Sequence, residues 1–345
     1  MLSSLHLRSI LLPCILSLTA GAALGQSATS IFSPAASPAQ WEYGLSMLVL
    51  SVTLVIFLVV GGLLLYAVIR FRQRPEDSER EPPQIYGSEQ IELSWTVIPI
   101  LIVVMLFLST TRVILETEAA AKPASALDVT VIGHQFWWEF RYPKYGVVTA
   151  NELHVPMSDP ARPTPTYLAM SSADVSHSFW VPRLAGKMDV IPNRLNTMWI
   201  DPWAPGLYLG QCAQYCGTQH AKMLLRVYAQ SPADFAAWIK QQQQPADQDL
   251  SNNSAAAEGR TVFMHSACIN CHTITGTPAT GRFGPDLTHL ASRDTIASGP
   301  VQNTAENLRK WIDNPDSMKP GVLMPSMHLN DHDLDVITAY LTTLH

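Results

Sequence analysis

Five side chains in the middle of the chain form a ligand set for soft metal ions. The segment Cys212-Ala-Gln-Tyr-Cys216-Gly-Thr-Gln-His220-Ala-Lys-Met223 supplies two thiols, an imidazole and a thioether, and His177 lies upstream. Such nitrogen and sulfur donors select copper over hard cations, and a thioether is typical of electron-transfer copper. A mononuclear blue site uses a single cysteine, whereas two cysteines at this spacing can bridge two metal ions.

Two other sites are compatible with some of these side chains. Zinc binds two cysteines and two histidines in a closed tetrahedral site, but it has no use for the thioether of Met223. A disulfide between Cys212 and Cys216 would suit an exported domain, but it leaves both histidines and the methionine unexplained. Copper accounts for the whole set.

A second cluster, Cys268-Ile-Asn-Cys271-His272, has the spacing of a c-type haem attachment site. Its two thiols add to the haem vinyl groups, and His272 supplies the proximal imidazole. A methionine as the sixth iron ligand would raise the reduction potential. A chance match and a redox-active dithiol are the alternatives, and the helical pattern around the motif favours haem.

Two long apolar stretches are expected to anchor these clusters to a membrane. Residues 45–69 and 93–115 are each long enough to cross about 30 Å of hydrocarbon as a helix. The loop between them carries four arginines, which the positive-inside rule puts in the cytoplasm: Arg70, Arg72, Arg74 and Arg80. The chain after about residue 116 then lies outside. Because Pro99 interrupts the second stretch, a helix buried in a protein core is the alternative there.

The composition agrees with a membrane protein. Of the 345 residues, 47% are apolar and only 14% are charged, which is low for a soluble protein. The formal net charge of -6 argues against a nucleic-acid partner and fits a basic partner surface. Residues 1–25 contain a basic start, an apolar run and a small-residue end, so they predict a signal peptide, with an uncleaved anchor as the alternative.

Three regions are expected after a transmembrane hairpin at residues 41–118. Residues 126–235 hold short runs of β-branched and aromatic residues between Pro, Gly and Asn, which is typical of a β-sandwich or barrel. Residues 240–256 are polar and of low complexity, so they predict a flexible tether. Residues 257–345 show helical periodicity, with Asp331 as the N-cap of the last helix, and predict a compact all-α domain.

The metal-binding segment resembles the binuclear copper A site of cytochrome c oxidase subunit II. The pattern Cys-x-x-x-Cys-Gly-x-x-His-x-x-Met matches, and so does the upstream position of the other histidine. The resemblance implies two bridging thiolates, one imidazole on each copper, and a thioether and a backbone carbonyl as weak ligands: Cys212, Cys216, His177, His220, Met223 and Gln214. It also implies a cupredoxin-like Greek-key β-sandwich, with three ligands on one loop.

The resemblance extends to three positions near subunit I and the membrane. The family has a glutamate that helps to hold magnesium at the contact with subunit I, and this chain has Gln214 in its place. Asp189 matches the region that meets subunit I and its magnesium. Glu92 matches a carboxylate at the cytoplasmic mouth of a proton pathway of subunit I, although it could equally be a solvated helix-end acid.

The aromatic segment Phe136-Trp137-Trp138 matches the family's site of electron uptake. There the family has a tryptophan near the surface, through which electrons arrive from cytochrome c. This chain has Phe136 at that position, with the two tryptophans beside it, so uptake is expected to be shared with a neighbour. Simple core packing at a strand is the alternative. Asp174 also matches a family position, and for both Asp174 and Asp189 an ordinary surface or turn acid is the alternative.

The C-terminal region resembles small class I cytochromes c. Gly284-Pro285-Asp286-Leu287 is similar to the loop after their haem motif, and Met324-Pro325 matches their axial methionine. Met327 is the alternative axial ligand. A membrane hairpin, a copper A domain and a cytochrome c domain in this order resemble subunit II of the caa-type cytochrome c oxidases.

That resemblance implies an electron-transferring subunit of a bacterial inner-membrane oxidase, spanning the membrane more than once, with its copper and haem domains on the periplasmic side. Electrons from cytochrome c or a similar donor would pass through haem c and copper A to subunit I, which reduces oxygen to water and pumps protons. The expected partners are subunit I, the other oxidase subunits, the donor and membrane lipid. A subunit of a copper-A-containing nitric oxide reductase and a membrane-anchored electron carrier are the alternatives.

Overall fold

The computed structural model describes residues 28–345 except for 73–83, 85, 119–121, 125, 160–162 and 248. The signal peptide expected at residues 1–25 and most of the arginine-containing loop therefore lie outside the described residues. The chain divides into two compact units, one of residues 40–121 and one that includes residues 122–345.

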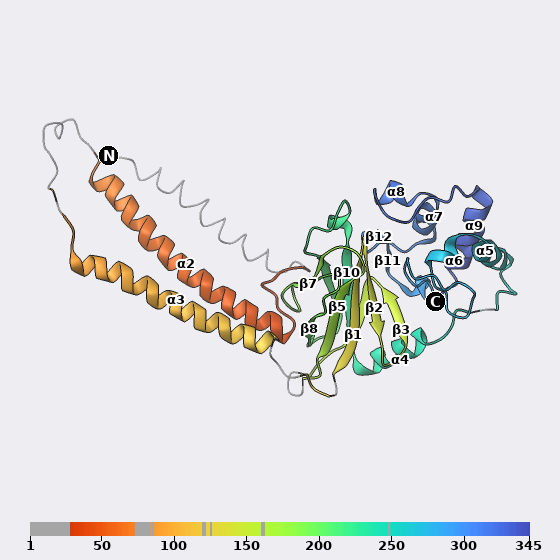
Figure 1. The fold of residues 1–345 in the computed structure, drawn as a ribbon, viewed down its shortest axis with the longest axis horizontal. Coiled ribbons are helices and arrows are strands. Elements are labelled where there is room, and N and C mark those ends of the chain that lie inside the picture. The colour runs from red at the N-terminus through yellow and green to blue at the C-terminus, as the bar shows by residue number, and fades with distance from the viewer. Residues whose placement is uncertain are drawn as a thin grey trace, which may run out of the picture. The chain divides into compact units, whose positions relative to one another are not determined.

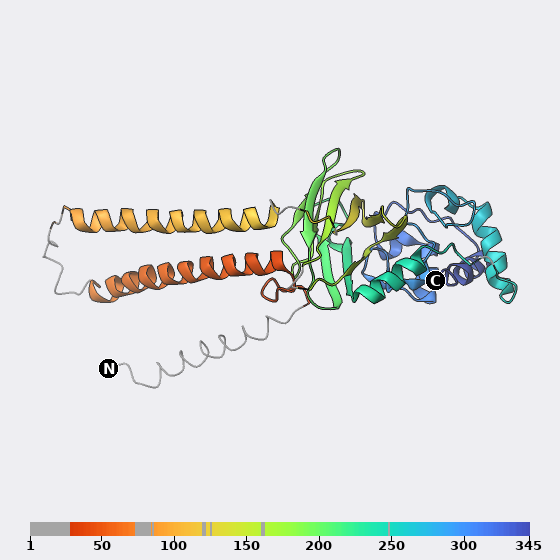
Figure 2. The same ribbon diagram turned by 90° about the horizontal axis from the view of Figure 1, so that it is seen from below.

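Two long helices, α2 (Ser37–Arg70) and α3 (Glu89–Glu118), make up most of the smaller unit and run antiparallel (Figures 1 and 2). Both are long and apolar enough to cross a membrane, and none of their most apolar stretches is buried within the protein. They include the expected spans and extend beyond them at both ends. Pro99 lies inside α3 without ending it.

The first part of the larger unit is a sandwich of two five-stranded sheets (Figure 1). One sheet has the strand order β3 (Val147–Ala150), β2 (Trp137–Tyr142), β1 (Leu127–His134), β5 (Thr166–Ser172) and β8 (Asn196–Ile200). The other has the order β4 (Glu152–Pro156), β10 (Leu224–Gln230), β9 (Gly206–Cys212), β6 (His177–Trp180) and β7 (Met188–Val190). β1 pairs with β5 and β10 with β4 in parallel, and the other neighbours are antiparallel.

Alternating burial along the strands builds the core between the two sheets. β10 alternates regularly between buried and partly exposed residues, as expected of a strand with one face on a core. Trp138 and Phe140 both meet the ring of Phe179 edge to face, with centroids 5.7 Å and 6.5 Å away. This rigid double sheet supports the metal-binding loop at one end of β9.

The second part of the larger unit is a small, mainly helical domain. Its helices and short strands are α5 (Ser254–His265), α6 (Cys268–Cys271), η4 (Leu290–Ser292), β11 (Thr295–Ile296), β12 (Val301–Gln302), α7 (Ala305–Asp313), α8 (Pro315–Met318) and α9 (Asp331–Leu341). The close approach of α5 to α9 depends on Gly259, because a Cβ there would lie 1.8 Å from the backbone oxygen of Val336. The N-cap of α9 is Asn330, which accepts from the backbone N–H of Asp333 at 2.9 Å, so the expected cap at Asp331 is wrong by one residue.

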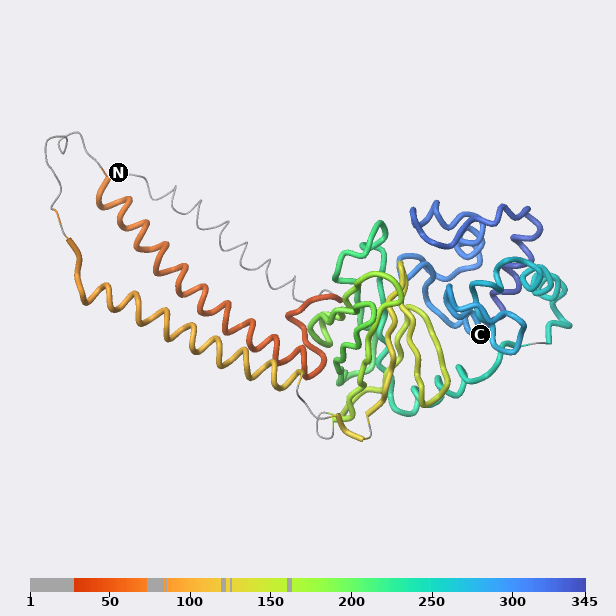
Figure 3. Tube along the Cα trace, viewed as in Figure 1, coloured from red at the N-terminus to blue at the C-terminus, as the bar shows by residue number. Residues whose placement is uncertain are grey.

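The connection between the two domains begins with a helix and contacts the helical domain. α4 (Pro232–Gln242) follows β10 and is capped by Ser231. The chain then crosses to the helical domain, a path that Figure 3 follows along the Cα trace. Ala246 is buried there and its N–H donates to Thr275 O at 3.1 Å, while the ring of His289 lies 3.0 Å from Gln244 O.

Candidate copper and haem sites

Three of the expected copper ligands lie within 4.8 Å of one another: His177, Cys212 and Cys216. The two Sγ atoms are 3.9 Å apart, and His177 Nδ1 is 3.9 Å from Cys212 Sγ. The backbone oxygen of Gln214 lies 3.2 Å from the same sulfur. The two cysteines and His177 are buried.

The other two expected ligands approach the second thiol. His220 Nδ1 is 3.7 Å from Cys216 Sγ, and Met223 Sδ is 3.8 Å from it. The structure thus brings all six donor groups together, with two adjacent thiols at the centre and one imidazole beside each. Two sulfurs flanked in this way fit a pair of bridged soft ions better than a single tetrahedral ion.

Different strands deliver these ligands. His177 begins β6 and Cys212 ends β9, two strands that pair in the second sheet. The loop after Cys212 turns through η3 (His220–Lys222), and the N–H of Cys212 donates to Met223 O at 2.9 Å, which closes the loop at its base. Ligands fixed on paired strands move little when an electron arrives.

An exposed carboxylate sets the orientation of the buried His177 ring. Its Nε2 lies 2.8 Å from Asp174 Oδ1. Because the carboxylate can only accept, the hydrogen is on Nε2, and Nδ1 is left to face Cys212. Burial lowers the pKa of His177, but the hydrogen bonds with Asp174 and Cys212 outweigh it and leave the pKa raised. Gly133 makes room for the ring, because a Cβ there would lie 2.8 Å from His177 Cδ2.

The haem-attachment residues line one apolar cavity in the helical domain, together with both candidate axial methionines: Cys268, Cys271, His272, Met324 and Met327. The cavity does not distinguish between the two methionines, since both line it. Arg293 also lines it, and its buried Nε has no hydrogen-bond partner among the described residues. Its Nη2 donates to Asp286 O, so one N–H of the buried guanidinium is left to pair with a haem propionate, and the residues present suit the group.

A backbone carbonyl fixes which nitrogen of the His272 ring carries the hydrogen. Its Nδ1 lies 2.8 Å from Pro285 O, and a carbonyl can only accept, so Nδ1 carries the hydrogen and Nε2 is left for iron. Burial lowers the pKa of His272, which keeps the imidazole neutral as a metal ligand requires. Gly284 allows this fit, because a Cβ there would lie 2.6 Å from His272 Cε1.

The aromatic segment lies between the two sites. Phe136 and Trp137 line the haem cavity, although they belong to the sandwich. Trp138 points into the core, where its ring lies 6.0 Å from that of His177. The ring of Phe136 also lies against the ligand loop, within 3.1 Å of where a Cβ on Gly217 would be.

The expected magnesium and proton-pathway residues belong to different elements. The side chain of Gln214 is exposed. Asp189 pairs with Ser178 in the sheet, and Ser178 O accepts from Ala213 N at 2.9 Å, so Asp189 lies one strand from the loop. Its nearest described charge is Lys187, at 3.7 Å. Glu92 is exposed in the first turn of α3.

Three residues near these sites were not expected from the sequence: Gln135, Glu152 and Lys319. Gln135 lines the haem cavity and donates from Nε2 to Cys216 O at 2.6 Å. Glu152 and Lys319 are almost fully buried where the two domains meet. Their significance depends on contacts between distant segments, for which the sequence has no periodic or motif signal.

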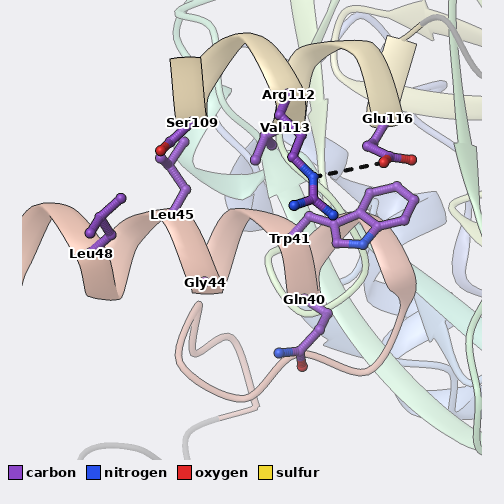
Figure 4. A pocket seen from close by; sticks show the side chains of 9 residues that line it. All are labelled: Gln40, Trp41, Gly44, Leu45, Leu48, Ser109, Arg112, Val113 and Glu116. Atoms are coloured by element: carbon purple, nitrogen blue, oxygen red, sulfur yellow. Dashed lines mark ion pairs between the residues drawn. The ribbon is translucent and has the colours of Figure 1, made fainter. Parts of the chain in front are cut away.

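A separate pocket of about 340 Å³ lies between α2 and α3 (Figure 4). Its polar end is formed by Arg112 and Glu116, one turn apart on α3, with Nε and Oε1 4.0 Å from each other. Trp41 from α2 lies beside them. None of these residues was expected to have a role.

Three known families match the chain. The transmembrane domain of cytochrome c oxidase subunit II matches residues 25–113, and its periplasmic domain matches residues 150–230. The cytochrome c family matches residues 256–345. Together these matches span the helices, most of the sandwich and the helical domain.

Relatives of similar length match this chain along almost its whole length. The chain is 32% identical over 326 residues to cytochrome c oxidase subunit 2 of Alkalihalophilus pseudofirmus, covering 93% of this chain and 92% of that protein. It is 34% identical over 340 residues to cytochrome c oxidase subunit 2 of Bacillus sp. strain PS3, covering 94% and 93%. The periplasmic domain of subunit II of the oxidase of Bradyrhizobium japonicum is 27% identical, with a TM-score of 0.33 over 36% of this chain and 97% of that structure.

Proposed function

Because the chain belongs to the cytochrome c oxidase subunit II family and carries a fused cytochrome c domain, we propose which of its residues carry out the electron relay of that subunit. The chain is the electron-transferring subunit of a haem-copper terminal oxidase, anchored in a membrane by its helices, with a periplasmic domain. When bound, copper A and a c-type haem supply the two one-electron centres of the relay. The site of oxygen reduction belongs to subunit I.

For copper A we assign the six donors that meet at the end of β9: His177, Cys212, Gln214 through its backbone oxygen, Cys216, His220 and Met223. This convergence is the observation that carries the proposal. The replacement of the family's glutamate by Gln214 leaves the donor unchanged, because the contact is made by a main-chain oxygen. Asp174 fixes the ring of His177 and is a positioning residue rather than a ligand.

For the haem we assign thioether bonds to Cys268 and Cys271 and axial bonds to His272 and Met324. The Pro285 carbonyl holds His272 with Nε2 free, which supports the proximal role. Arg293 is suited to neutralise a propionate inside the cavity. Met324 is preferred over Met327 on its sequence context alone.

The aromatic residues of the sandwich are assigned to electron transfer within the chain. Phe136 and Trp137 line the haem cavity, so in this chain they lie between the haem domain and the copper ligands. We therefore assign them to the step from haem to copper A, while an external donor delivers its electron to the haem domain. Trp138 supports His177 from the core.

Three further residues are assigned to contacts with subunit I and the membrane. Asp189 and Gln214 are assigned to the contact with subunit I, where they would hold magnesium, and Glu92 to the mouth of a proton pathway. The two helices would cross a bacterial inner membrane in contact with lipid and the other oxidase subunits, with the sandwich and haem domain in the periplasm. The relatives reported above are oxidase subunits, which favours this reading over a nitric oxide reductase subunit or a free-standing electron carrier.

Purification of the complex from its native membrane tests the proposal. Visible spectra should show a c-type haem, and electron paramagnetic resonance should show a mixed-valence copper pair. A Cys216→Ser variant should lose the pair and retain the haem, because the sulfur between His220 and Met223 is gone. A copper-replete, folded protein without the mixed-valence signal, or a variant that keeps it, would overturn the assignment.

A further inference from the structure

A buried amino group crosses the boundary between the sandwich and the haem domain. Lys319, from the haem domain, is 2% exposed. Its Nζ donates to Phe136 O in the sandwich at 2.8 Å and to Ala297 O in its own domain at 3.0 Å. Lysine is almost never fully buried without partners, and one of its two partners exists only when the domains are in contact.

A buried carboxyl group crosses the same boundary in the other direction. Glu152, the first residue of β4 in the sandwich, is 3% exposed. Its Oε1 accepts from the backbone N–H of Asp294 at 3.0 Å, and from the N–H and hydroxyl of Thr295 at 3.1 Å and 3.3 Å. Each domain thus places one buried polar side chain against the backbone of the other.

These contacts lie beside the two redox sites. Lys319 and Phe136 both line the haem cavity. The residue after the ligand Met223 is Leu224, whose N–H donates to Ser298 O at 3.0 Å while its own carbonyl accepts from Ser298 Oγ at 3.0 Å. The interface therefore connects the cavity wall directly to the copper-ligand loop.

We propose that Lys319 and Glu152 are positioning residues that hold the haem domain against the copper domain in the orientation required for electron transfer. The inference rests on the proposed function, since it assumes haem and copper A at the two sites. Electron transfer slows steeply with distance, so a domain on a tether that samples many orientations transfers slowly on average. If either contact is lost, buried N–H or carbonyl groups of the other domain are left without partners in the docked state, which favours separation.

Two variants remove one contact each. Lys319→Met keeps the length of the side chain but cannot donate to the two carbonyls. Glu152→Leu removes the acceptor of three donors at similar volume, and Glu152→Gln keeps an Oε1 acceptor and should restore docking. Lys222→Met is the matched control, because the exposed Lys222 crosses the same boundary to Met318 O at 3.3 Å without being buried.

Two measurements on the intact oxidase separate positioning from folding. Pulsed electron paramagnetic resonance gives the distribution of distances between the ferric haem and copper A. Rapid-mixing kinetics give separate rates for haem reduction by an external donor and for transfer from haem to copper A. We expect a narrow distance distribution in the parent protein and the Lys222 variant, and a broad one in Lys319→Met and Glu152→Leu. Internal transfer should slow at least tenfold in these two, with external reduction changed less than twofold.

Several results would overturn the inference. One is a broad distribution of haem-to-copper distances in the parent protein, and another is an unchanged rate of internal transfer in both Lys319→Met and Glu152→Leu. A third is a Glu152→Gln variant that does not restore the narrow distribution and the transfer rate that Glu152→Leu loses. If Lys319→Met does not assemble, the Glu152 pair decides alone. Failure of the proposed function is distinct, because it would appear as a missing haem or copper A spectrum in the parent protein itself.

Discussion

Gln135 Nε2 donates to the backbone oxygen of Cys216 at 2.6 Å, and the same glutamine lines the haem cavity. Its backbone N–H donates to Asp174 Oδ2 at 2.6 Å, and Asp174 holds His177. One residue therefore contacts the haem cavity and, by hydrogen bonds, both halves of the copper-ligand cluster.

We expect Gln135→Leu to slow internal electron transfer from haem to copper A. The leucine side chain retains most of the apolar contact with the cavity but cannot donate to Cys216 O. The hydrogen bond between the cavity wall and the copper-ligand loop is therefore lost, and the loop is held less firmly. Rapid-mixing kinetics should show a decrease of about threefold to tenfold, with haem reduction by the external donor unaffected. Gln135→Glu, whose carboxylate cannot donate to Cys216 O, should transfer as slowly as the leucine variant. A leucine or glutamate variant with the parent rate would argue against a role for this hydrogen bond.

The axial haem ligand can be decided by two parallel substitutions. We expect Met324→Leu to lower the reduction potential of the haem and to abolish the sulfur-to-iron absorption band, because thioether ligation favours the reduced iron. Met327→Leu should retain the band and most of the potential. Spectra and redox titration of each purified variant make the comparison, and the reverse pattern would identify Met327 as the ligand.

The contact between α5 and α9 should not tolerate a methyl group at Gly259. A Cβ there would lie 1.8 Å from Val336 O, a backbone atom that cannot rotate away. Gly259→Ala should therefore destabilise the haem domain by about 3 kcal/mol, the upper end of the range for overpacking. Thermal unfolding followed by haem-band circular dichroism measures this. Ala257→Ser, at an exposed position of the same helix, is the control and should change the midpoint little.

Glu152 should make docking of the haem domain weaken as pH rises. Burial raises the pKa of Glu152 to about 7, against the opposing effects of Arg293 and Arg226, while Asp294 adds to the increase. The docked state then holds a proton that the separated domains release between about pH 4.5 and 7. The contribution of Glu152 to the stability of the docked state is fully present below about pH 4.5, the ordinary pKa of the carboxyl group. It is lost as the pH rises through about 7, the pKa in the docked state.

The full loss is about 3 kcal/mol, because the pKa of Glu152 differs between about 4.5 and about 7 and one pKa unit corresponds to about 1.4 kcal/mol. Thermal unfolding of the haem domain between pH 5 and 8 should show the decline in the parent protein and a flatter profile in Glu152→Gln. An equal decline of stability with pH in the two proteins would exclude Glu152 as the cause of that decline.

The sequence predicts the parts of this molecule whose signals are local. The helix, strand and helical-domain regions follow from periodicity, and the three-part fold is confirmed by the family matches. Four of the five copper-binding side chains lie within one twelve-residue segment, so their spacing alone indicates a common site. The hydrogen bond between Asp174 and His177 is also local, three residues apart.

The contacts between domains could not be predicted in this way. Lys319 and Phe136 are 183 residues apart, and a single lysine in a loop resembles any solvated lysine. The composition of residues 240–256 indicates a tether, but it does not reveal that Ala246 is buried against the helical domain. Such contacts arise from surface complementarity between folded parts, which leaves no repeating pattern in the chain.

The shared wall of the haem cavity has a consequence for biogenesis. Gln135, Phe136, Trp137 and Asn151 of the sandwich line the cavity that also holds Cys268 and Cys271. The machinery that forms the thioether bonds must reach these cysteines from outside the folded domain. Docking on the sandwich covers part of that approach, so haem attachment is expected to come first, and a chain that fails to receive haem would present an incomplete surface for closing the two domains together.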